Sequence, residues 1–261
     1  MQNADQIIAT AHEMADAARA AILPLFRQDG IATDNKRPGD YDPVTEADRA
    51  AERAMRDVLA RRRPQDAILG EEYGAQAGES GLTWVLDPID GTRAFLCGAP
   101  SWGVLIGLRD ADGVRYGLID QPYTGERFEG GLGQARMRGP MGARDLRVRG
   151  GIALSGARLM TTFPEVGTPD DGAAFRRVAA QVQLTRYGLD CYAYALLAMG
   201  QIDLVIEAGL QSYDIVGPMA VVQAAGGIVT DWQGGPAADG GRVIAAASPE
   251  LHRAALDLLN A

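Results

Sequence analysis

Residues 84–95 determine most of what this sequence predicts, and they read Trp84-Val85-Leu86-Asp87-Pro88-Ile89-Asp90-Gly91-Thr92-Arg93-Ala94-Phe95. An apolar run ends here in two aspartates, which is the pattern of a buried strand that delivers carboxylates to the edge of a sheet. Pro88 fixes φ where the strand ends, and Gly91 permits a tight turn and a close approach of backbone to a ligand. If a helix begins at Thr92, the free N–H groups of its first turn can bind an anion.

Two interpretations of this stretch are open. Carboxylate oxygens beside a phosphate-sized pocket of N–H groups are what a magnesium-dependent phosphatase needs. The alternative is structural: a strand, a turn and a helix cap in which Asp87 and Asp90 only accept hydrogen bonds from backbone N–H groups. The acidic residues elsewhere in the chain bear on this choice.

Composition limits the function classes. The chain has 261 residues, 47% hydrophobic and 23% charged, which fits one large domain or two closely packed smaller ones. A net charge of −9 disfavours partners such as nucleic acid and anionic membranes. There is no signal-peptide pattern, and no apolar run approaches the ~18–20 residues of a membrane span. With Cys97 and Cys191 alone no disulfide framework is implied, so we expect a cytoplasmic protein. We expect His12 and His252 at surface helix positions and not in catalysis.

Hydrophobic periodicity gives the element order. It predicts helices over residues 3–26, 45–63, 170–181, 191–199, 215–225 and 249–259, and strands over 67–70, 84–86, 102–108, 113–121, 158–161, 182–186, 204–207, 227–230 and 243–246. Turns at 122–125 and 130–133 join the middle strands into an antiparallel meander, whereas strands and helices alternate after about residue 150. The fold class predicted is a layered α/β protein, with lobes over residues 1–149 and 150–261.

Three further acids stand where elements begin or end. Asp48 follows Thr45 by three residues, so it either completes a capping box or orients a water from a rigid helix start. Glu71 follows the strand over 67–70, and if that strand neighbours the one ending at Asp87, the two carboxylates meet. Asp214 precedes an apolar helix, where its ordinary role is an N-terminal cap that also points out of the helix start.

Four segments taken together resemble the inositol monophosphatase family of magnesium-dependent phosphatases. They are Asp42-x-Val44-Thr45-x-Ala47-Asp48, Gly70-Glu71-Glu72, the stretch from Trp84 to Thr92, and Tyr213-Asp214 followed by Ala224-Ala225-Gly226-Gly227. They occur in the family's order and span most of the chain. The resemblance implies a sandwich of alternating helix and sheet layers, a phosphomonoester substrate and a homodimer.

The resemblance also assigns roles to residues. Glu71, Asp87 and the Ile89 carbonyl would hold one Mg²⁺, and Asp87, Asp90 and Asp214 a second, with a third, weaker ion near Glu71. Asp48 and Thr92 would orient the attacking water, and the Gly91–Thr92 backbone would cradle the phosphate. This assignment agrees with the preference of Mg²⁺ for oxygen ligands.

Substrate choice rests on finer features. Arg93-Ala94-Phe95 follow Thr92 where inositol phosphatases generally carry an asparagine before the phenylalanine. Residues 119–128 and 186–195 look like the histidinol-phosphate phosphatase branch of histidine biosynthesis. The preferred substrate is therefore L-histidinol phosphate, with Arg93, Asp190, Glu207 and Asp214 as candidate substrate contacts; Asp190 is alternatively a cap of the helix that follows it. Other interpretations are an inositol-1-phosphate or broad sugar-phosphate phosphatase, a nucleotide 3′-phosphatase, and a silent Mg²⁺- or anion-binding module.

Overall fold

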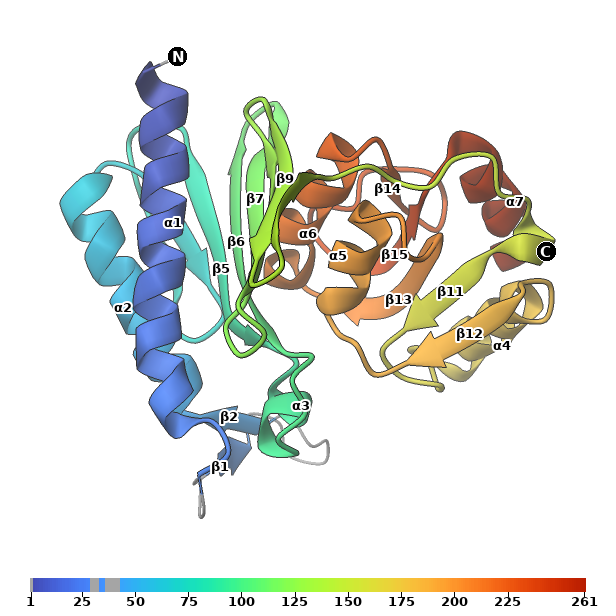
Figure 1. Ribbon diagram of the computed structural model, residues 1–261, viewed down its shortest axis with the longest axis horizontal. Coiled ribbons are helices and arrows are strands. Elements are labelled where there is room, and N and C mark those ends of the chain that lie inside the picture. Colours follow the sequence, from blue (N-terminus) through green and yellow to red (C-terminus); the bar gives the residue numbers. More distant parts are fainter. Residues whose placement is uncertain (1, 29–32, 36–42) are drawn as a thin grey trace.

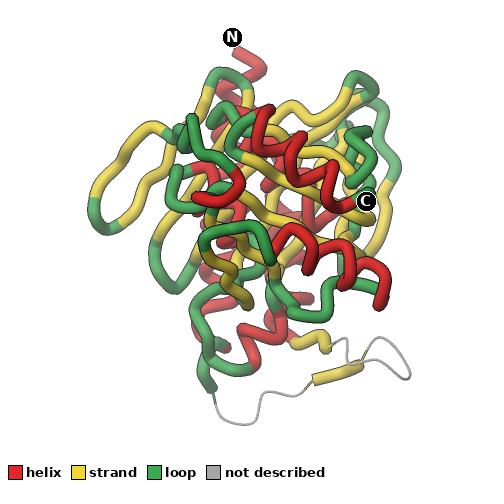
Figure 2. Tube along the Cα trace, turned by 90° about the vertical axis from the view of Figure 1, so that its right-hand side faces the viewer, coloured by secondary structure: helices red, strands yellow, loops and turns green. Residues whose placement is uncertain are grey.

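Two large sheets alternate with three layers of helices in the computed structural model, which describes residues 2–28, 33–35 and 43–261. In Figure 1 the order of layers begins with α1 (Gln2–Ile22) and α2 (Glu46–Arg62), followed by an eight-stranded sheet and then α5 (Tyr192–Ala198) and α6 (Ser212–Ala224). A five-stranded sheet comes next, and α4 (Pro169–Ala179) and α7 (Pro249–Leu259) cover its outer face; Figure 2, seen from that side, shows helices in front of strands. The layered α/β fold is therefore confirmed.

The eight-stranded sheet has the order β10-β9-β8-β7-β6-β5-β3-β4. Its strands are β3 (Ala67–Gly70), β4 (Gly74–Gln76), β5 (Thr83–Asp90), β6 (Gly103–Asp110), β7 (Gly113–Gln121), β8 (Glu126–Gly131), β9 (Gln134–Gly139) and β10 (Gly142–Asp145). Strand β3 runs parallel to β5, whereas the other pairs in this sheet are antiparallel. The carboxyl ends of β3 and β5 therefore lie at the same edge.

The second sheet has the order β12-β11-β13-β15-β14. Its strands are β11 (Arg158–Thr161), β12 (Leu184–Tyr187), β13 (Leu204–Leu210), β14 (Ile228–Asp231) and β15 (Gly241–Ala246). The remaining elements are short: β1 (Thr33–Asn35) paired with β2 (Pro43–Thr45), the helix α3 (Thr92–Leu96), and the 3-10 turns Leu23–Leu25 and Leu154–Gly156.

Alternation along the strands sends side chains to different cores. On β6, Val104 and Ile106 pack against α1 and α2, whereas Leu105 between them packs with α5 and α6. The middle core also takes Val205 and Val243 from the second sheet, so the two sheets share α5 and α6. Because β5 is buried on both faces, it reads as a continuous apolar run before its aspartates.

Most predicted elements are present with ends shifted by a few residues, while β4 and β10 carry no periodic signal and were not predicted. The expectation for the histidines was wrong for His252, which is 9% exposed and lies 2.7 Å from the Thr230 hydroxyl. His12 is partly buried against Glu129. Asp42 lies outside the described residues, and the division into lobes at residue 149 stays a prediction. None of the described helices is long and apolar enough to span a membrane.

Candidate active site

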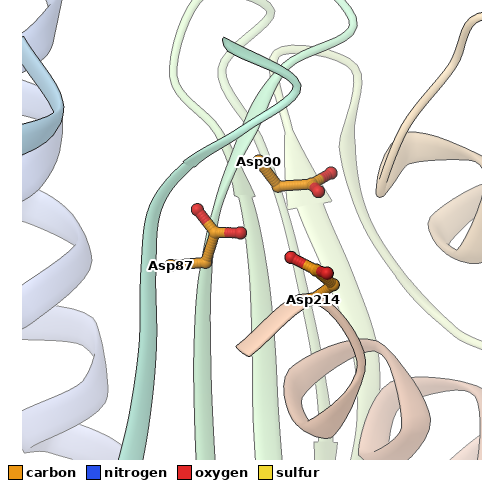
Figure 3. Close-up of side chains that lie close together, drawn as sticks. All are labelled: Asp87, Asp90 and Asp214. Carbon is orange, nitrogen blue, oxygen red and sulfur yellow. The ribbon is translucent and has the colours of Figure 1, made fainter. Parts of the chain in front are cut away.

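The end of β5 brings Asp87 and Asp90 to one side of the chain. In a regular strand, residues three apart point to opposite faces. Here the pairing of β5 with β6 shifts register between Asp87 and Asp90, and Pro88, which has no N–H to donate, lies within the irregularity. Both carboxylates consequently point into the same space, as Figure 3 shows.

Asp214 reaches the same space from α6. Oxygen atoms of Asp87, Asp90 and Asp214 all lie within 4.8 Å of one another, and the three side chains converge in Figure 3. The expectation that Asp214 caps its helix is wrong in detail, because α6 begins at Ser212 and its N-cap is Gln211. One Asp214 oxygen accepts a hydrogen bond from the Gln211 N–H at 2.6 Å, which holds the carboxylate over the helix start.

Glu71 lies beside this trio, as the parallel strands predict. Gly70 pairs with Leu86 across β3 and β5, and the Glu71 side chain contacts Asp87. The loop after β3 is held by Glu52 of α2, which accepts hydrogen bonds from the Glu72 and Tyr73 N–H groups at 2.7 and 3.2 Å. Gly70 is required here because a Cβ atom would lie 2.0 Å from a Glu52 oxygen.

The cluster carries more negative charge than its surroundings can solvate. Burial raises the pKa of Asp87 well above its ordinary value, and the charges of Glu71, Asp90 and Asp214 raise it further. Burial also raises the pKa of Asp90, followed by the charges of Asp190 and Asp214. Buried, mutually repelling carboxylates are the donor set that a hard divalent cation neutralises. The residues present therefore fit Mg²⁺.

Asp48 completes the capping box of α2 with one oxygen, and its other oxygen faces Thr92. Its Oδ2 accepts hydrogen bonds from the Thr45 N–H at 2.9 Å and the Thr45 hydroxyl at 2.6 Å, which completes the capping box of α2. Its Oδ1 faces the Thr92 hydroxyl at 3.3 Å. The same hydroxyl lies 3.1 Å from the Ile89 carbonyl oxygen. The helix start thus fixes a carboxylate whose second oxygen is directed at Thr92.

Gly91 is the N-cap of α3 and adopts a left-handed conformation with φ of 88°. A Cβ atom there would also lie 2.8 Å from Cγ of Asp190, so both conformation and space require glycine. Asp190 itself is not a cap: the N-cap of α5 is Cys191, with no side-chain capping bond, and Asp190 has φ of 47°. The Cys191 N–H donates to Oδ2 of Asp90 at 2.5 Å, which ties the start of α5 to the trio.

Two carboxylates lie beyond the trio. Burial raises the pKa of Asp190 to about 6, against the lowering influence of a Ser101 hydrogen bond and the Arg93 charge. Glu207 on β13 is 6% exposed, and its burial raises its pKa to about 7. Arg93 is exposed, with its guanidinium carbon 4.9 Å from the centre of the Phe163 ring. The Arg93 guanidinium is therefore close enough to Asp190 to lower its pKa.

Comparison with known proteins agrees with this geometry. The model of the inositol monophosphatase family matches residues 3–261. The chain belongs to the inositol monophosphatase family. It is 39% identical to the bifunctional phosphatase IMPL2 of Arabidopsis thaliana over 98% of this chain and 75% of that protein. A histidinol-phosphatase of Streptomyces coelicolor is 35% identical over 96% of this chain and 95% of its own.

Among solved structures, an inositol monophosphatase from Zymomonas mobilis has a TM-score of 0.87 at 38% identity and covers 98% of each chain. These relatives make this family member a metal-dependent phosphomonoesterase. They divide between two substrates by name, so the family alone leaves the substrate open between histidinol phosphate and inositol phosphate.

Sequence reasoning missed two residues beside the site. Ser101, whose hydroxyl donates to the Gly188 carbonyl at 3.3 Å, lowers the pKa of Asp190, and Tyr194 lies in an apolar helix pattern that predicts a core side chain. Neither carries a local signal, because the fold brings each of them to the site from a distant part of the sequence.

Proposed function

We propose that this family member hydrolyses L-histidinol phosphate to L-histidinol and phosphate. The observation that carries the proposal is the pair Asp190 and Glu207, buried or partly buried carboxylates close to but outside the acidic trio. An alcohol portion with an ammonium group and an imidazole is the kind of ligand that such a pair favours electrostatically. A polyol offers no charge to these groups.

The proposed roles follow from the contacts described. Glu71, Asp87, Asp90, Asp214 and the Ile89 carbonyl would hold two or three Mg²⁺ ions. Bound Mg²⁺ lowers the pKa of water and neutralises charge on the phosphoryl group. The Thr92 hydroxyl donates toward Asp48 or the Ile89 carbonyl, so its lone pairs are left to accept a hydrogen bond from the attacking water. A water held there would lie beside the phosphate, which the Gly91–Thr92 backbone would cradle, and no covalent phosphoenzyme is needed.

A second candidate is an inositol-1-phosphate or broad sugar-phosphate phosphatase. It is favoured by Glu207, because a buried carboxylate accepts hydrogen bonds from a polyol as readily as from a cation. A nucleotide 3′-phosphatase ranks third, since that branch also tolerates a charged residue, here Arg93, after Asp90-Gly91-Thr92. The silent-module interpretation fits poorly with a chain that keeps Asp48, Thr92 and the acidic trio in contact. The homodimer also remains a proposal taken from the family.

The test is a comparison of kcat/KM for histidinol phosphate, inositol 1-phosphate and adenosine 3′,5′-bisphosphate, each with and without Mg²⁺. We expect phosphate release from every substrate that the enzyme accepts to depend on Mg²⁺. The kcat/KM for histidinol phosphate should exceed the others by about tenfold or more, which corresponds to ~1.4 kcal/mol. Equal or higher kcat/KM for inositol 1-phosphate would replace the substrate assignment. Release of phosphate without any divalent cation would remove the mechanism.

A further inference from the structure

Tyr194 carries a hydroxyl that the protein itself does not satisfy. The residue is 3% exposed, yet among the described residues its hydroxyl finds no hydrogen-bond partner. Two other tyrosine hydroxyls behave differently: that of Tyr192 donates to Glu126 at 2.6 Å, and that of Tyr116 donates to Glu129 at 2.7 Å. A buried hydroxyl without a partner is destabilising, and a phenylalanine would fill the same space without that cost.

The position of Tyr194 points to the active site. Tyr194 lies in the first turn of α5, and the backbone N–H of the N-cap Cys191 donates to Asp90 at 2.5 Å. Helix α5 packs against α6, which carries Asp214, and against β13, which carries Glu207. Burial raises the pKa of Tyr194, and the charges of Glu207, Asp90 and Asp214 raise it further, in that order. The Tyr194 side chain is therefore close enough to all three carboxylates for their charges to raise its pKa.

We propose that Tyr194 is a specificity-determining residue whose hydroxyl oxygen accepts a hydrogen bond from an N–H or O–H group of the substrate's alcohol portion. A tyrosine hydroxyl carries one proton and two lone pairs, so a hydroxyl that has no partner in the described part of the protein is left to bond to a group of the ligand. A site built this way selects alcohol portions that carry a hydrogen-bond donor. The inference rests on the proposed phosphatase function and adds to it a contact distant from the phosphate.

The alternative role is that of a core side chain. A core role needs the ring alone, because the hydroxyl contributes no bond to the fold. Tyr194→Phe then leaves kinetics unchanged and raises or preserves the melting temperature. A ligand role gives the same melting behaviour but alters KM, so the kinetics separate the two roles. Tyr192→Phe, on the same helix, is the matched control because its hydroxyl has a partner away from the acidic trio.

The experiment measures kcat/KM of wild type, Tyr194→Phe and Tyr192→Phe with Mg²⁺ on histidinol phosphate, inositol 1-phosphate and p-nitrophenyl phosphate, whose alcohol portion has no donor. We expect Tyr194→Phe to lower kcat/KM for the better donor-bearing substrate, relative to p-nitrophenyl phosphate, at least tenfold and mainly through KM. Tyr192→Phe should keep wild-type ratios and lose melting temperature. A Tyr194→Phe ratio within twofold of wild type on both donor-bearing substrates overturns the inference. If the wild type prefers inositol 1-phosphate, only the substrate assignment is overturned. The effect of Tyr194→Phe is then measured as the change in kcat/KM for inositol 1-phosphate relative to p-nitrophenyl phosphate.

Discussion

The burial of Glu207 predicts how the free energy of unfolding changes with pH, in both sign and magnitude. Glu207 accepts hydrogen bonds from the Thr162 N–H at 2.7 Å, the Thr162 hydroxyl at 2.9 Å and the Thr161 hydroxyl at 3.1 Å. Burial outweighs these bonds and raises its pKa from 4.5 to about 7. Because the folded protein holds this proton more tightly than the unfolded chain, the associated stability is fully present below pH ~4.5 and is lost as the pH rises toward 7.

At ~1.4 kcal/mol for each pKa unit, this difference corresponds to about 3 kcal/mol in total. Most of it, roughly 2 kcal/mol, is lost between pH 5 and pH 8. In Glu207→Gln the side chain cannot ionise and that loss disappears. The measurement is urea unfolding of metal-free wild type and variant across this pH range. We expect the free-energy difference between them to shift by about 2 kcal/mol in favour of the variant as the pH rises.

Asp171→Asn is the matched control. Burial alone would raise the pKa of Asp171, but hydrogen bonds from Thr168 and the charge of Arg242 outweigh it and lower the pKa from its ordinary value of 3.8. Asp171 is therefore ionised in both states above pH 5, and its contribution to stability is lost only as the pH falls below its ordinary pKa. The variant should be less stable than wild type by an amount that stays constant from pH 5 to pH 8. A Glu207→Gln difference that is equally constant would refute the reasoning about burial.

Three further outcomes concern activity. Asp87→Asn should lose most turnover and the Mg²⁺-induced rise in melting temperature while remaining folded, since it removes one of the converging charges; an unchanged response to Mg²⁺ in thermal denaturation would contradict this. Thr92→Ala should lower kcat far more than it weakens substrate binding, and its stability loss should stay near ~1 kcal/mol because only one hydroxyl contact goes. Asp190→Asn should raise KM for histidinol phosphate more than for p-nitrophenyl phosphate, and an equal effect on both would make Asp190 structural.

The sequence predicted the acidic site best where local rules act alone. An apolar run that ends in Asp87 and a second that ends before Glu71 predict two strands, and both are present. Whether the two strands are neighbours was left open, and β3 pairs with β5 in parallel. The capping box at Thr45 and Asp48 is likewise a local pattern, and both of its hydrogen bonds are present.

The prediction was less successful where contacts between distant segments decide the geometry. Asp190 was considered as a helix cap, but its left-handed backbone and its contact with Gly91 come from the crossing of two loops. Asp214 was interpreted as the N-cap of its helix, but the N-cap is Gln211, three residues earlier. The helix therefore includes Ser212 and Tyr213, and the Asp214 carboxylate accepts a hydrogen bond from the Gln211 N–H. Capping propensity predicts that such residues lie near a helix start, but it does not predict their exact position there or the direction of their side chains.

The same long-range contacts explain why the carboxylates of Asp87, Asp90 and Asp214 lie close together. Strand β5 supplies Asp87 and Asp90, and the N–H of Cys191 holds Asp90 while Gln211 holds Asp214. Each anchoring bond orients its carboxylate, and the oxygens of Asp87, Asp90 and Asp214 converge on the shared space. In the folded, metal-free protein these carboxylates repel one another when they are ionised. A bound divalent cation relieves that repulsion. Stability and metal affinity are therefore linked through the same residues, so substitutions that weaken Mg²⁺ binding should stabilise the metal-free protein.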